Sequence, residues 1–326
     1  MGAGVAAAPP AVPLPGRAAP GEQTRARYPD ETGFIERNGV RVFWERYGDG
    51  SPAVLLMPTW SVFHSRHWKL QIPDLARRFR VLTFDGRGNG RSDRPTDAAA
   101  YADTEFVADA LAVLDATGTD RAVVAGLSMG AGYGLRMAVD HPDRVLGLAM
   151  FGASIPVTDR DPSESPGPDA SFEEPAPDDE GWNRYNAVFW RRDWPGFADW
   201  FVRQIFSEPH STKPIEDGTG WFLHTDAETI VTAEYAPFLR PPADWDRNSP
   251  SEGDAIPFLR RVRCPVLVVH GTDDRIVGIA QARRAAAVLG VPLVELQGGG
   301  HSPIGREPVR TNLLLRRFIR SLEARP

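Results

Sequence analysis

The chain has 326 residues, of which 42% are hydrophobic and 25% charged, proportions that exclude a fibrous or wholly disordered protein and predict a large buried core. Its formal net charge of -6 gives no electrostatic attraction to phosphate backbones or anionic lipid surfaces, so nucleic acid is not expected as a partner. No apolar run approaches the roughly 18 residues that a membrane-spanning helix requires, and the single cysteine, Cys264, excludes a disulfide framework and is expected to be a buried structural thiol.

Residues 1–27 form a segment rich in proline and alanine. It has no basic region at its start, and its prolines interrupt any apolar stretch, so it lacks the pattern of a signal peptide. We expect a disordered tail at 1–27. A lone thiol suits a reducing compartment, and the protein is predicted to be cytoplasmic.

Strands and helices alternate through the first half of the chain. The stretch "FIERNGVRVFWERYG" predicts a β-hairpin that turns at Asn38 and Gly39. The apolar run at 53–58 predicts a buried strand, and a helix is expected over 65–79. There follow a strand at 80–85, a helix capped by Asp103 or Thr104 that stops at Gly118, the strand "RAVVAGL", a helix to His141 and a strand at 144–152.

This alternation stops near Ser154 and resumes with a strand at 264–271, a helix near 279–289, the strand "PLVELQ" and a final helix from Glu307 to Ala324. Parallel strands need crossover connections, so the pattern predicts an α/β fold with a mostly parallel, doubly wound sheet. The interruption is interpreted as an inserted helical lid at 155–262, which divides the core into 28–154 and 263–326. The acidic stretch from Asp159 to Glu180 within it is expected to be a solvated, mobile connector, with a gating role as the alternative.

The most informative short motif is "GLSMG", in which Ser128 stands between a buried strand and a helix. A serine on such a sharp turn has its hydroxyl lifted out at the end of the sheet, and Gly126 and Gly130 remove the side chains that would clash. A serine hydroxyl needs a base within hydrogen-bond reach, and the base needs a carboxylate to orient it. Ser128 is therefore predicted to be a nucleophile.

Both partners are available later in the chain. "VLVVHGTDDRIVG" places acidic residues just after a strand, and "LQGGGHSP" places His301 in a glycine loop just after the next strand. The order serine, acid, histidine, with each residue at a sheet end, is the order found in the alpha/beta-hydrolase arrangement.

From about Phe34 to Leu322 the chain resembles the alpha/beta-hydrolase superfamily, in its lidded ester-hydrolase and meta-cleavage-product-hydrolase-like branch. "LTFDGRGNGRSDRP" is similar to that superfamily's loop after the fourth strand, and "HGTDDRIV" resembles its acid motif. The resemblance implies that Asp274 is the acid, with Asp273 as the neighbouring alternative, and that His301 is the base. It implies neither a cofactor nor a metal.

Attack on an ester carbonyl creates an oxyanion, which must be stabilised by hydrogen bonds from NH groups that point at it. The resemblance implies the backbone NH of Met129 as the first donor. The second donor usually follows an H-G pair, but this chain has Met57-Pro58 there. Proline has no NH, so Thr59 or Trp60 is the candidate, and the Trp60 indole is expected either to wall the acyl pocket or to pack in the core.

The remaining histidines are assigned lesser roles. His64 and His67 lack an apparent third metal ligand and are expected to flank the pocket entrance or cap a helix, while His270 is interpreted as a packing residue. Six of the nine tryptophans fall in the predicted lid, and they are expected either to roof an apolar or aromatic substrate or to pack the lid helices. They are Trp182, Trp190, Trp194, Trp200, Trp221 and Trp245.

The sequence thus predicts a serine hydrolase that cleaves a carboxylic ester, lactone or thioester, with a small apolar or aromatic acyl compound as substrate. A C-C bond hydrolase or a cofactor-free perhydrolase could use the same residues, and a ligand-binding homologue without turnover is the alternative from another class. Epoxide hydrolases and haloalkane dehalogenases are disfavoured because their nucleophile is an aspartate. No pattern predicts an oligomeric state.

Overall fold

The computed structural model describes residues 25–158, 163–168, 171–239 and 255–323. Most of the predicted tail at 1–27, part of the acidic stretch and Trp245 lie outside these residues. The described residues contain one sheet of eight strands in the order β1-β2-β4-β3-β5-β6-β7-β8. The strands are Glu31–Arg37 (β1), Val40–Tyr47 (β2), Ala53–Leu56 (β3), Arg80–Phe84 (β4), Ala122–Leu127 (β5), Val145–Phe151 (β6), Val266–Gly271 (β7) and Leu293–Leu296 (β8).

The sheet is mostly parallel, as predicted. Only β2 runs against its neighbours β1 and β4, and every other pairing is parallel. The first two strands form the expected hairpin, in which Asn38 and Gly39 have positive φ angles of 53° and 77°. A two-residue turn with both φ values positive matches the twist of the two strands, and asparagine followed by glycine tolerates it best.

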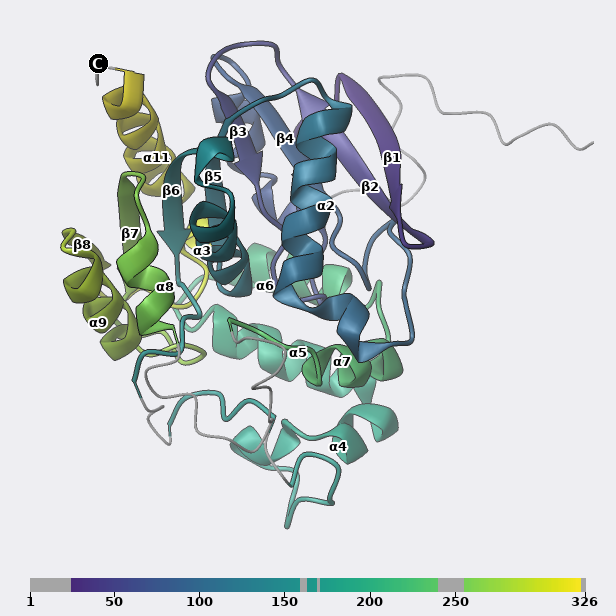
Figure 1. The fold of residues 1–326 in the computed structure, drawn as a ribbon. Helices are drawn as coiled ribbons and strands as arrows, with labels where there is room; N and C mark the ends of the chain where they lie inside the picture. The colour runs from purple at the N-terminus through teal and green to yellow at the C-terminus, as the bar shows by residue number, and fades with distance from the viewer. Residues whose placement is uncertain (1–24, 159–162, 169–170, 240–254, 324–326) are drawn as a thin grey trace, which may run out of the picture.

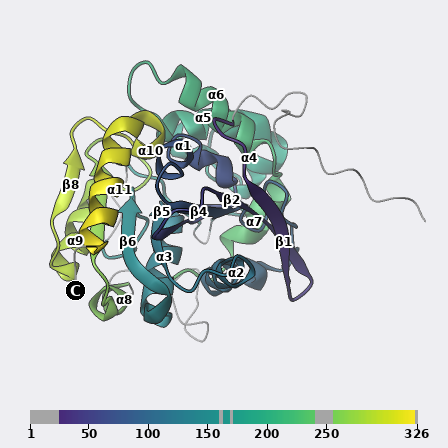
Figure 2. The same cartoon turned by 90° about the horizontal axis from the view of Figure 1, so that it is seen from above.

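Helices cover both faces of the sheet (Figure 2). Asp103–Ala116 (α2), Met129–Asp140 (α3), Ile256–Arg261 (α8) and Ile279–Leu289 (α9) lie on one face, and Ile72–Leu75 (α1), Pro303–Arg306 (α10) and Pro308–Glu323 (α11) lie on the other. The central strands are apolar on both sides because both faces are covered; all six residues of β5 are buried. A separate apolar cluster lies on each face.

Three local predictions need correction. The helix expected over 65–79 is instead a short 3-10 turn, Ser65–Trp68, followed by the four-residue α1, with Pro73 fixing the start of the second piece. Helix α2 has Ala102 at its N-cap, because the Asp103 carboxylate accepts hydrogen bonds from the backbone NH groups of Thr104 and Leu239 instead. The final helix begins at Pro308, after the separate turn α10.

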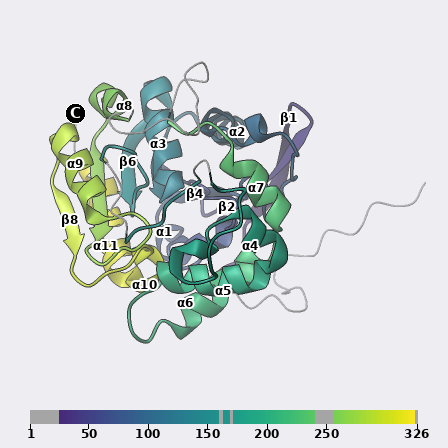
Figure 3. The ribbon, with the colours of Figure 1, turned by 90° about the horizontal axis from the view of Figure 1, so that it is seen from below.

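Four helices form a layer at one end of the sheet (Figures 1 and 3). They are Ala187–Arg192 (α4), Trp194–Ile205 (α5), Thr212–Phe222 (α6) and Ala227–Glu234 (α7), and we call them the α4–α7 layer. The layer has its own apolar cluster, in which Phe197 and Phe222 are fully buried. No strand occurs in the described part of 155–262, as the sequence predicts.

The strand order reverses between β3 and β5. From β3 the chain passes to β4 on one side, whereas β5 pairs with the other side of β3 and leads to β6. In open α/β sheets, ligands bind outside the carboxyl ends of the strands at such a switch point. The loop that starts at Met57 and the turn at Ser128 leave the sheet here, so the fold brings together two segments that the sequence places far apart.

Candidate active site

Ser128 occupies a strained backbone position between β5 and α3. Its φ and ψ angles are 55° and −123°, and it is one of the few described residues other than glycine with a positive φ. Such a conformation costs of order 1–3 kcal/mol and is seen where function requires it. The turn holds Ser128 at the N-terminus of α3, and the residue is 9% exposed.

The two glycines of the motif allow this turn to close. A Cβ atom on Gly126 would lie 2.2 Å from the carbonyl oxygen of Gly130, and one on Gly130 would lie 2.3 Å from the carbonyl oxygen of Pro58. Neither position has room for a side chain. The close approach at Gly130 also brings the turn that carries Ser128 against the loop after β3.

Asp274 and His301 form a hydrogen-bonded pair. Oδ2 of Asp274 lies 2.8 Å from Nδ1 of His301, and both residues are buried. Oδ1 of Asp274 accepts hydrogen bonds from the backbone NH groups of Ile276 and Val277, at 2.8 and 2.9 Å. The alternative acid, Asp273, is exposed, and its carboxylate accepts from the Thr272 hydroxyl.

His270 contacts the same carboxylate, which sequence reasoning missed. Its Nε2 lies 3.1 Å from Oδ2 of Asp274 and 2.7 Å from the carbonyl oxygen of Val277, and the residue is fully buried. His270 is therefore more than a packing residue. The sequence did place His270 at the end of the predicted strand, four residues before Asp274, and this spacing could have indicated the contact.

The environment of Asp274 favours its charged form. Burial alone would raise its pKa, but the charge interaction with His301 and the hydrogen bonds from His270 and His301 outweigh burial, and the pKa falls well below its ordinary value. Burial would lower the pKa of His270, but the hydrogen bond and charge of Asp274 raise it. Asp274 is thus a carboxylate whose Oδ2 contacts two imidazoles.

Ser128 and His301 both pack against the short turn that follows β6. The NH of Ser128 donates to the carbonyl oxygen of Phe151 at 3.0 Å, and its own carbonyl accepts from the NH of Ser154 at 3.1 Å. Between these two contacts, a Cβ atom on Gly152 would lie 3.4 Å from Nδ1 of His301. Within the described residues, no hydrogen bond joins the Ser128 hydroxyl to the imidazole.

The loop that carries His301 is bonded to the end of α5. The NH of His301 donates to the carbonyl oxygen of Ile205 at 3.1 Å, and the NH of Gly300 donates to Oε1 of Glu208 at 2.7 Å. Oε2 of Glu208 is buried and has no partner among the described atoms. The position of the imidazole therefore depends on the α4–α7 layer as well as on the sheet.

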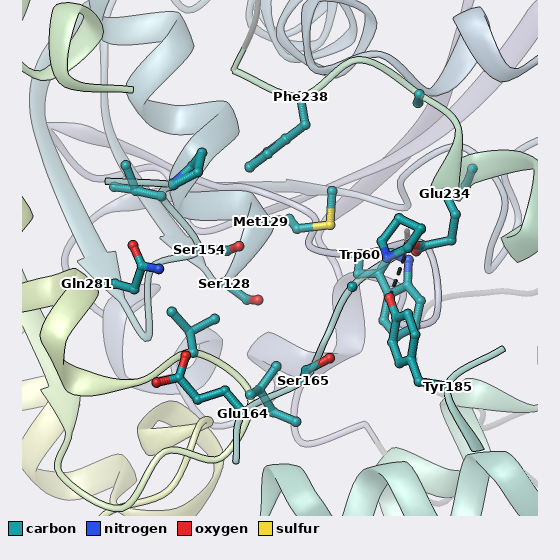
Figure 4. A pocket seen from close by; sticks show the side chains of 18 of the residues that line it. Trp60, Ser128, Met129, Ser154, Glu164, Ser165, Tyr185, Glu234, Phe238 and Gln281 are labelled. Atoms are coloured by element: carbon teal, nitrogen blue, oxygen red, sulfur yellow. Dashed lines mark hydrogen bonds between the residues drawn. The ribbon is translucent and has the colours of Figure 1, made fainter. Parts of the chain in front are cut away.

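A cavity of about 250 Å³ opens onto Ser128 (Figure 4). Met129 and Trp60, two of the three expected oxyanion-hole residues, line it together with Ser128, while Thr59 is buried outside the lining. Trp60 also packs on the α4–α7 layer, with its ring centroid 5.2 Å from that of Phe201. Trp60 thus walls the pocket and packs in an apolar cluster at once.

Of the two expectations for the tryptophans of 155–262, packing is the one that the described residues support. The described tryptophans of 155–262 do not line the cavity, because they pack with other aromatic rings; the Trp182 and Trp200 rings are 5.0 Å apart. The aromatic walls of the cavity are instead Trp60, Tyr101, Tyr185, Phe201 and Phe238.

The acidic stretch also contributes to the site. Glu164 and Ser165 line the cavity, and Ser165 is buried, so this part of 159–180 is not simply a solvated connector.

His64 and His67 lie in the buried turn before α1. His64 caps this turn, since its Nδ1 accepts from the NH of Arg66, as one of the two expectations had it. In the described ranges no cluster of three or more His, Cys, Asp or Glu side chains is placed to hold a metal ion. No helix in those ranges is both long and apolar enough to cross a bilayer.

Fold and site together define an alpha/beta-fold hydrolase. The chain belongs to the alpha/beta hydrolase fold family, whose model matches residues 52–308. Among its relatives, epoxide hydrolase A of Mycobacterium tuberculosis is 27% identical over 320 residues, covering 90% of this chain and 98% of that protein. 2-Hydroxymuconate semialdehyde hydrolase of a Pseudomonas species is 34% identical over 130 residues, which cover 37% of this chain and 44% of that protein.

Solved structures share the fold. An enol-lactonase from Burkholderia xenovorans LB400 superimposes with a TM-score of 0.69 at 22% identity, covering 88% of this chain and 99% of that one. Est816, described as an N-acyl homoserine lactone degrading enzyme, gives a TM-score of 0.68 at 24% identity, covering 88% and 100%. At this level of identity the likeness extends to the fold alone.

Proposed function

We propose that this hydrolase cleaves a carboxylic ester, lactone or thioester through an acyl-enzyme formed on Ser128. The observation that carries the proposal is the hydrogen-bonded pair of Asp274 and His301, whose imidazole packs against the same turn after β6 as Ser128, a serine with a φ of 55°. A strained serine and a carboxylate-bound histidine at one sheet end are the parts that acyl transfer needs.

In this mechanism the three side chains have separate roles. Nδ1–H of His301 donates to Asp274, which leaves Nε2 to take the proton from the Ser128 hydroxyl as it attacks the carbonyl carbon. The imidazolium then gives that proton to the leaving alcohol or thiol. A water molecule, deprotonated by the same nitrogen, releases the acid. Serine and histidine need not be hydrogen-bonded before substrate binds, because catalytic hydrogen bonds are often long in ligand-free enzymes.

For the oxyanion, we propose the backbone NH groups of Met129 and Trp60. Met129 is the first residue of α3, where backbone NH groups are unpaired and the helix dipole favours negative charge. Trp60 is chosen over Thr59 because Trp60 lines the cavity with Ser128 and Thr59 does not. Loss of one such donor typically costs about 3 kcal/mol of transition-state stabilisation.

We further propose that residues 155–262 act as the lid of a core formed by 28–154 and 263–326. The α4–α7 layer lies at the sheet end that carries Ser128, and Tyr185 and Phe201 of this segment line the cavity. Such a lid excludes water and supports apolar or aromatic substrates, while Glu164 and Ser165 add polar contacts.

The nucleophile separates this proposal from the chemistry of the M. tuberculosis relative. Epoxide hydrolases attack with an aspartate, whereas this chain has Ser128 at the elbow. C-C bond hydrolysis and perhydrolysis use the same serine arrangement, and we place ester, lactone or thioester cleavage first because it requires only the groups described above.

The test is hydrolysis of p-nitrophenyl acetate and butyrate by the wild type and by Ser128→Ala. We expect the variant to lose turnover while its circular dichroism spectrum and thermal unfolding midpoint stay close to the wild type. A fluorophosphonate probe should label the wild type at Ser128 and leave the variant unlabelled. Equal rates in the two proteins, or a folded wild type that is neither active nor labelled, would refute the proposal.

A further inference from the structure

Phe238 is an aromatic wall of the cavity and packs directly on α3. The residue follows α7, lines the cavity and is half-buried. A Cβ atom on Gly132 would lie 2.3 Å from Cζ of Phe238, so the ring occupies the space that a side chain at position 132 would fill. Ser128 is the N-cap of α3, and Gly132 lies about one helical turn further along. The Phe238 ring is therefore held close to the start of the helix that carries Ser128.

Asp103 holds the backbone on both sides of Phe238. Its NH donates to the carbonyl oxygen of Pro237 at 3.2 Å, and its Oδ2 accepts from the NH of Leu239 at 2.9 Å. Asp103 is the first residue of α2 and is 1% exposed. Hydrogen bonds that involve a charged group are stronger than those between neutral groups. The two contacts fix the position of the single residue that lies between them.

Leu239 has a strained backbone directly after Phe238. Its φ is 53°, in the left-handed region that residues with a branched side chain seldom adopt. Leu239 is fully buried, and its NH is the group bonded to Asp103. Strain of this kind persists only where the surroundings hold the residue in place, and it is frequent at ligand sites. Here it gives the chain the direction that places the Phe238 side chain in the cavity wall.

Two further rings support Phe238 on the side of the core. The centroids of Phe238 and Tyr133 are 5.8 Å apart, with the ring planes at 80°, and Tyr133 stacks on Phe106 at 4.4 Å and 4°. Tyr133 and Phe106 are both buried. Closely packed core rings leave little room for a neighbour to move into. Phe238 is thus a fixed wall of the cavity.

The direction of proton transfer indicates which part of the substrate faces Phe238. In the proposed function His301 gives a proton to the leaving oxygen, so this oxygen faces the imidazole and the acyl chain leaves the carbonyl carbon in another direction. The carboxylate of Glu164 lies against the start of α9, just after the turn that carries Asp274 and hence on the side of the imidazole. In Figure 4, Glu164 and Phe238 appear on different sides of Ser128. The acyl chain therefore extends toward Phe238.

We propose that Phe238 sets the upper limit on the length of the acyl chain that the enzyme accepts. The inference rests on the proposed function and specifies the acyl group of its substrate. The chain lies along α3 with its end against the Phe238 ring, and the absence of a side chain at Gly132 lets the ring take this position. When the ring is removed, the cavity extends toward Tyr133 and admits longer chains. Phe238 is a specificity-determining residue of the proposed reaction.

The experiment uses p-nitrophenyl acetate, butyrate, hexanoate and octanoate with the wild type, Phe238→Ala, Gly132→Ala and the double variant. The measured quantity is the ratio of kcat/KM for octanoate to kcat/KM for acetate within each protein, so that a loss of folded enzyme cancels. In Phe238→Ala this ratio should rise about tenfold, because a hydrophobic pocket discriminates by this order when it gains room for methylene groups. Phe238→Leu, a smaller change that keeps the site apolar, should raise the ratio in the same direction.

Gly132→Ala tests the same wall from the side of α3. The added Cβ displaces the Phe238 ring into the cavity, so the octanoate-to-acetate ratio should fall about threefold. In the double variant there is no ring to displace, and the alanine at position 132 should change the ratio little relative to Phe238→Ala. This coupling between the two substitutions is expected only if the residues act through one contact.

Phe318→Ala is the matched control. Phe318 is a half-buried phenylalanine of α11, on the other face of the sheet, and it lies outside the described lining of the cavity. Its ring also lies against a glycine, since a Cβ atom on Gly147 would be 3.0 Å from its Cζ. The control should lower the thermal unfolding midpoint, as any loss of a packed ring does, and leave the octanoate-to-acetate ratio at the wild-type value.

The outcomes separate this inference from the proposed function. An unchanged ratio in Phe238→Ala and Phe238→Leu, or an equal rise in Phe318→Ala, overturns the inference while the serine mechanism stands. A second series of alkyl acetates, followed by acid release, tests the direction of the substrate: if Phe238→Ala gains activity on long alcohols and not on long acyl chains, the acyl assignment is overturned. If the wild type hydrolyses none of these esters and a fluorophosphonate does not label it, the proposed function itself has failed.

Discussion

Nε2 of His270 lies 3.1 Å from Oδ2 of Asp274, the oxygen that also binds His301. Two backbone NH groups occupy the other oxygen, so the buried carboxylate is surrounded by hydrogen-bond partners. A buried charge is tolerated only when it is paired and hydrogen-bonded. His270 therefore fixes the orientation of the acid, and through the acid it positions the imidazole of His301.

His270→Gln should destabilise the protein more in acid than in base. The pKa of His270 is raised in the folded state, because the hydrogen bond and charge of Asp274 outweigh the opposing effect of burial. A raised pKa contributes stability that is fully present below the unfolded value of about 6.5 and is lost as pH rises through the folded value. Urea unfolding at pH 5.5 and pH 9 should show a smaller stability difference between wild type and variant at the higher pH. A difference that grows with pH would contradict this assignment.

Asp274→Asn should lower kcat for p-nitrophenyl esters by about 10⁴-fold, because an amide can hold the imidazole with the wrong nitrogen protonated. The chain provides its own control in Asp273, which is exposed and pairs with Thr272. Asp273→Asn should leave kcat within about twofold of the wild type, since surface substitutions away from special features change little. A loss of kcat in Asp273→Asn as large as that in Asp274→Asn would contradict the assignment of Asp274 as the acid that orients His301.

Glu208 should act as a positioning residue for the histidine loop. Its Oε1 accepts from the NH of Gly300, directly before His301. Glu208→Ala leaves that NH unpaired, a cost of about 1–3 kcal/mol, and should lower kcat/KM about tenfold. Glu208→Gln retains an acceptor oxygen and should recover most of this loss. If Glu208→Gln and Glu208→Ala lower kcat/KM equally, the hydrogen bond from Gly300 does not position the histidine loop.

A covalent phosphonate adduct on Ser128 should identify the second oxyanion donor. In its crystal structure we expect the phosphoryl oxygen to lie about 3 Å from the backbone nitrogens of both Met129 and Trp60. The measurement needs no substitution and so avoids disturbing the loop after β3. An oxygen bound by the NH of Thr59 in place of Trp60 would contradict the assignment.

Local patterns in the sequence predicted much of this molecule. The parallel sheet, the hairpin at Asn38 and Gly39 and the turn at Ser128 all depend on residues close together in the chain, whose periodicity or backbone requirements can be recognised directly. The prediction of one helix over 65–79 was wrong, because apolar spacing alone does not reveal that a separate short helix begins near Pro73.

The contacts around the site depend on tertiary structure. His270 reaches Asp274 because β7 ends beside the turn that carries Asp274, and its place near the end of a strand does not by itself reveal that contact. Glu164 lies in an acidic, proline-rich stretch that is typical of solvated connectors, yet it lines the cavity. Long-range packing decides both positions, so the charge of the cavity could not be predicted from composition.

The hydrogen bond from His301 to Ile205 links the proposed general base to the C-terminal end of α5. A displacement of α5 large enough to admit substrate would strain or break this hydrogen bond. The loop that carries His301 would then shift, and the imidazole would no longer point toward Ser128. Substrate entry and proton transfer by His301 would then be separate steps of the catalytic cycle. If Ser128 acts as proposed, water that entered during such a displacement would find a serine without a positioned base, and acyl transfer would require α5 to return to its place.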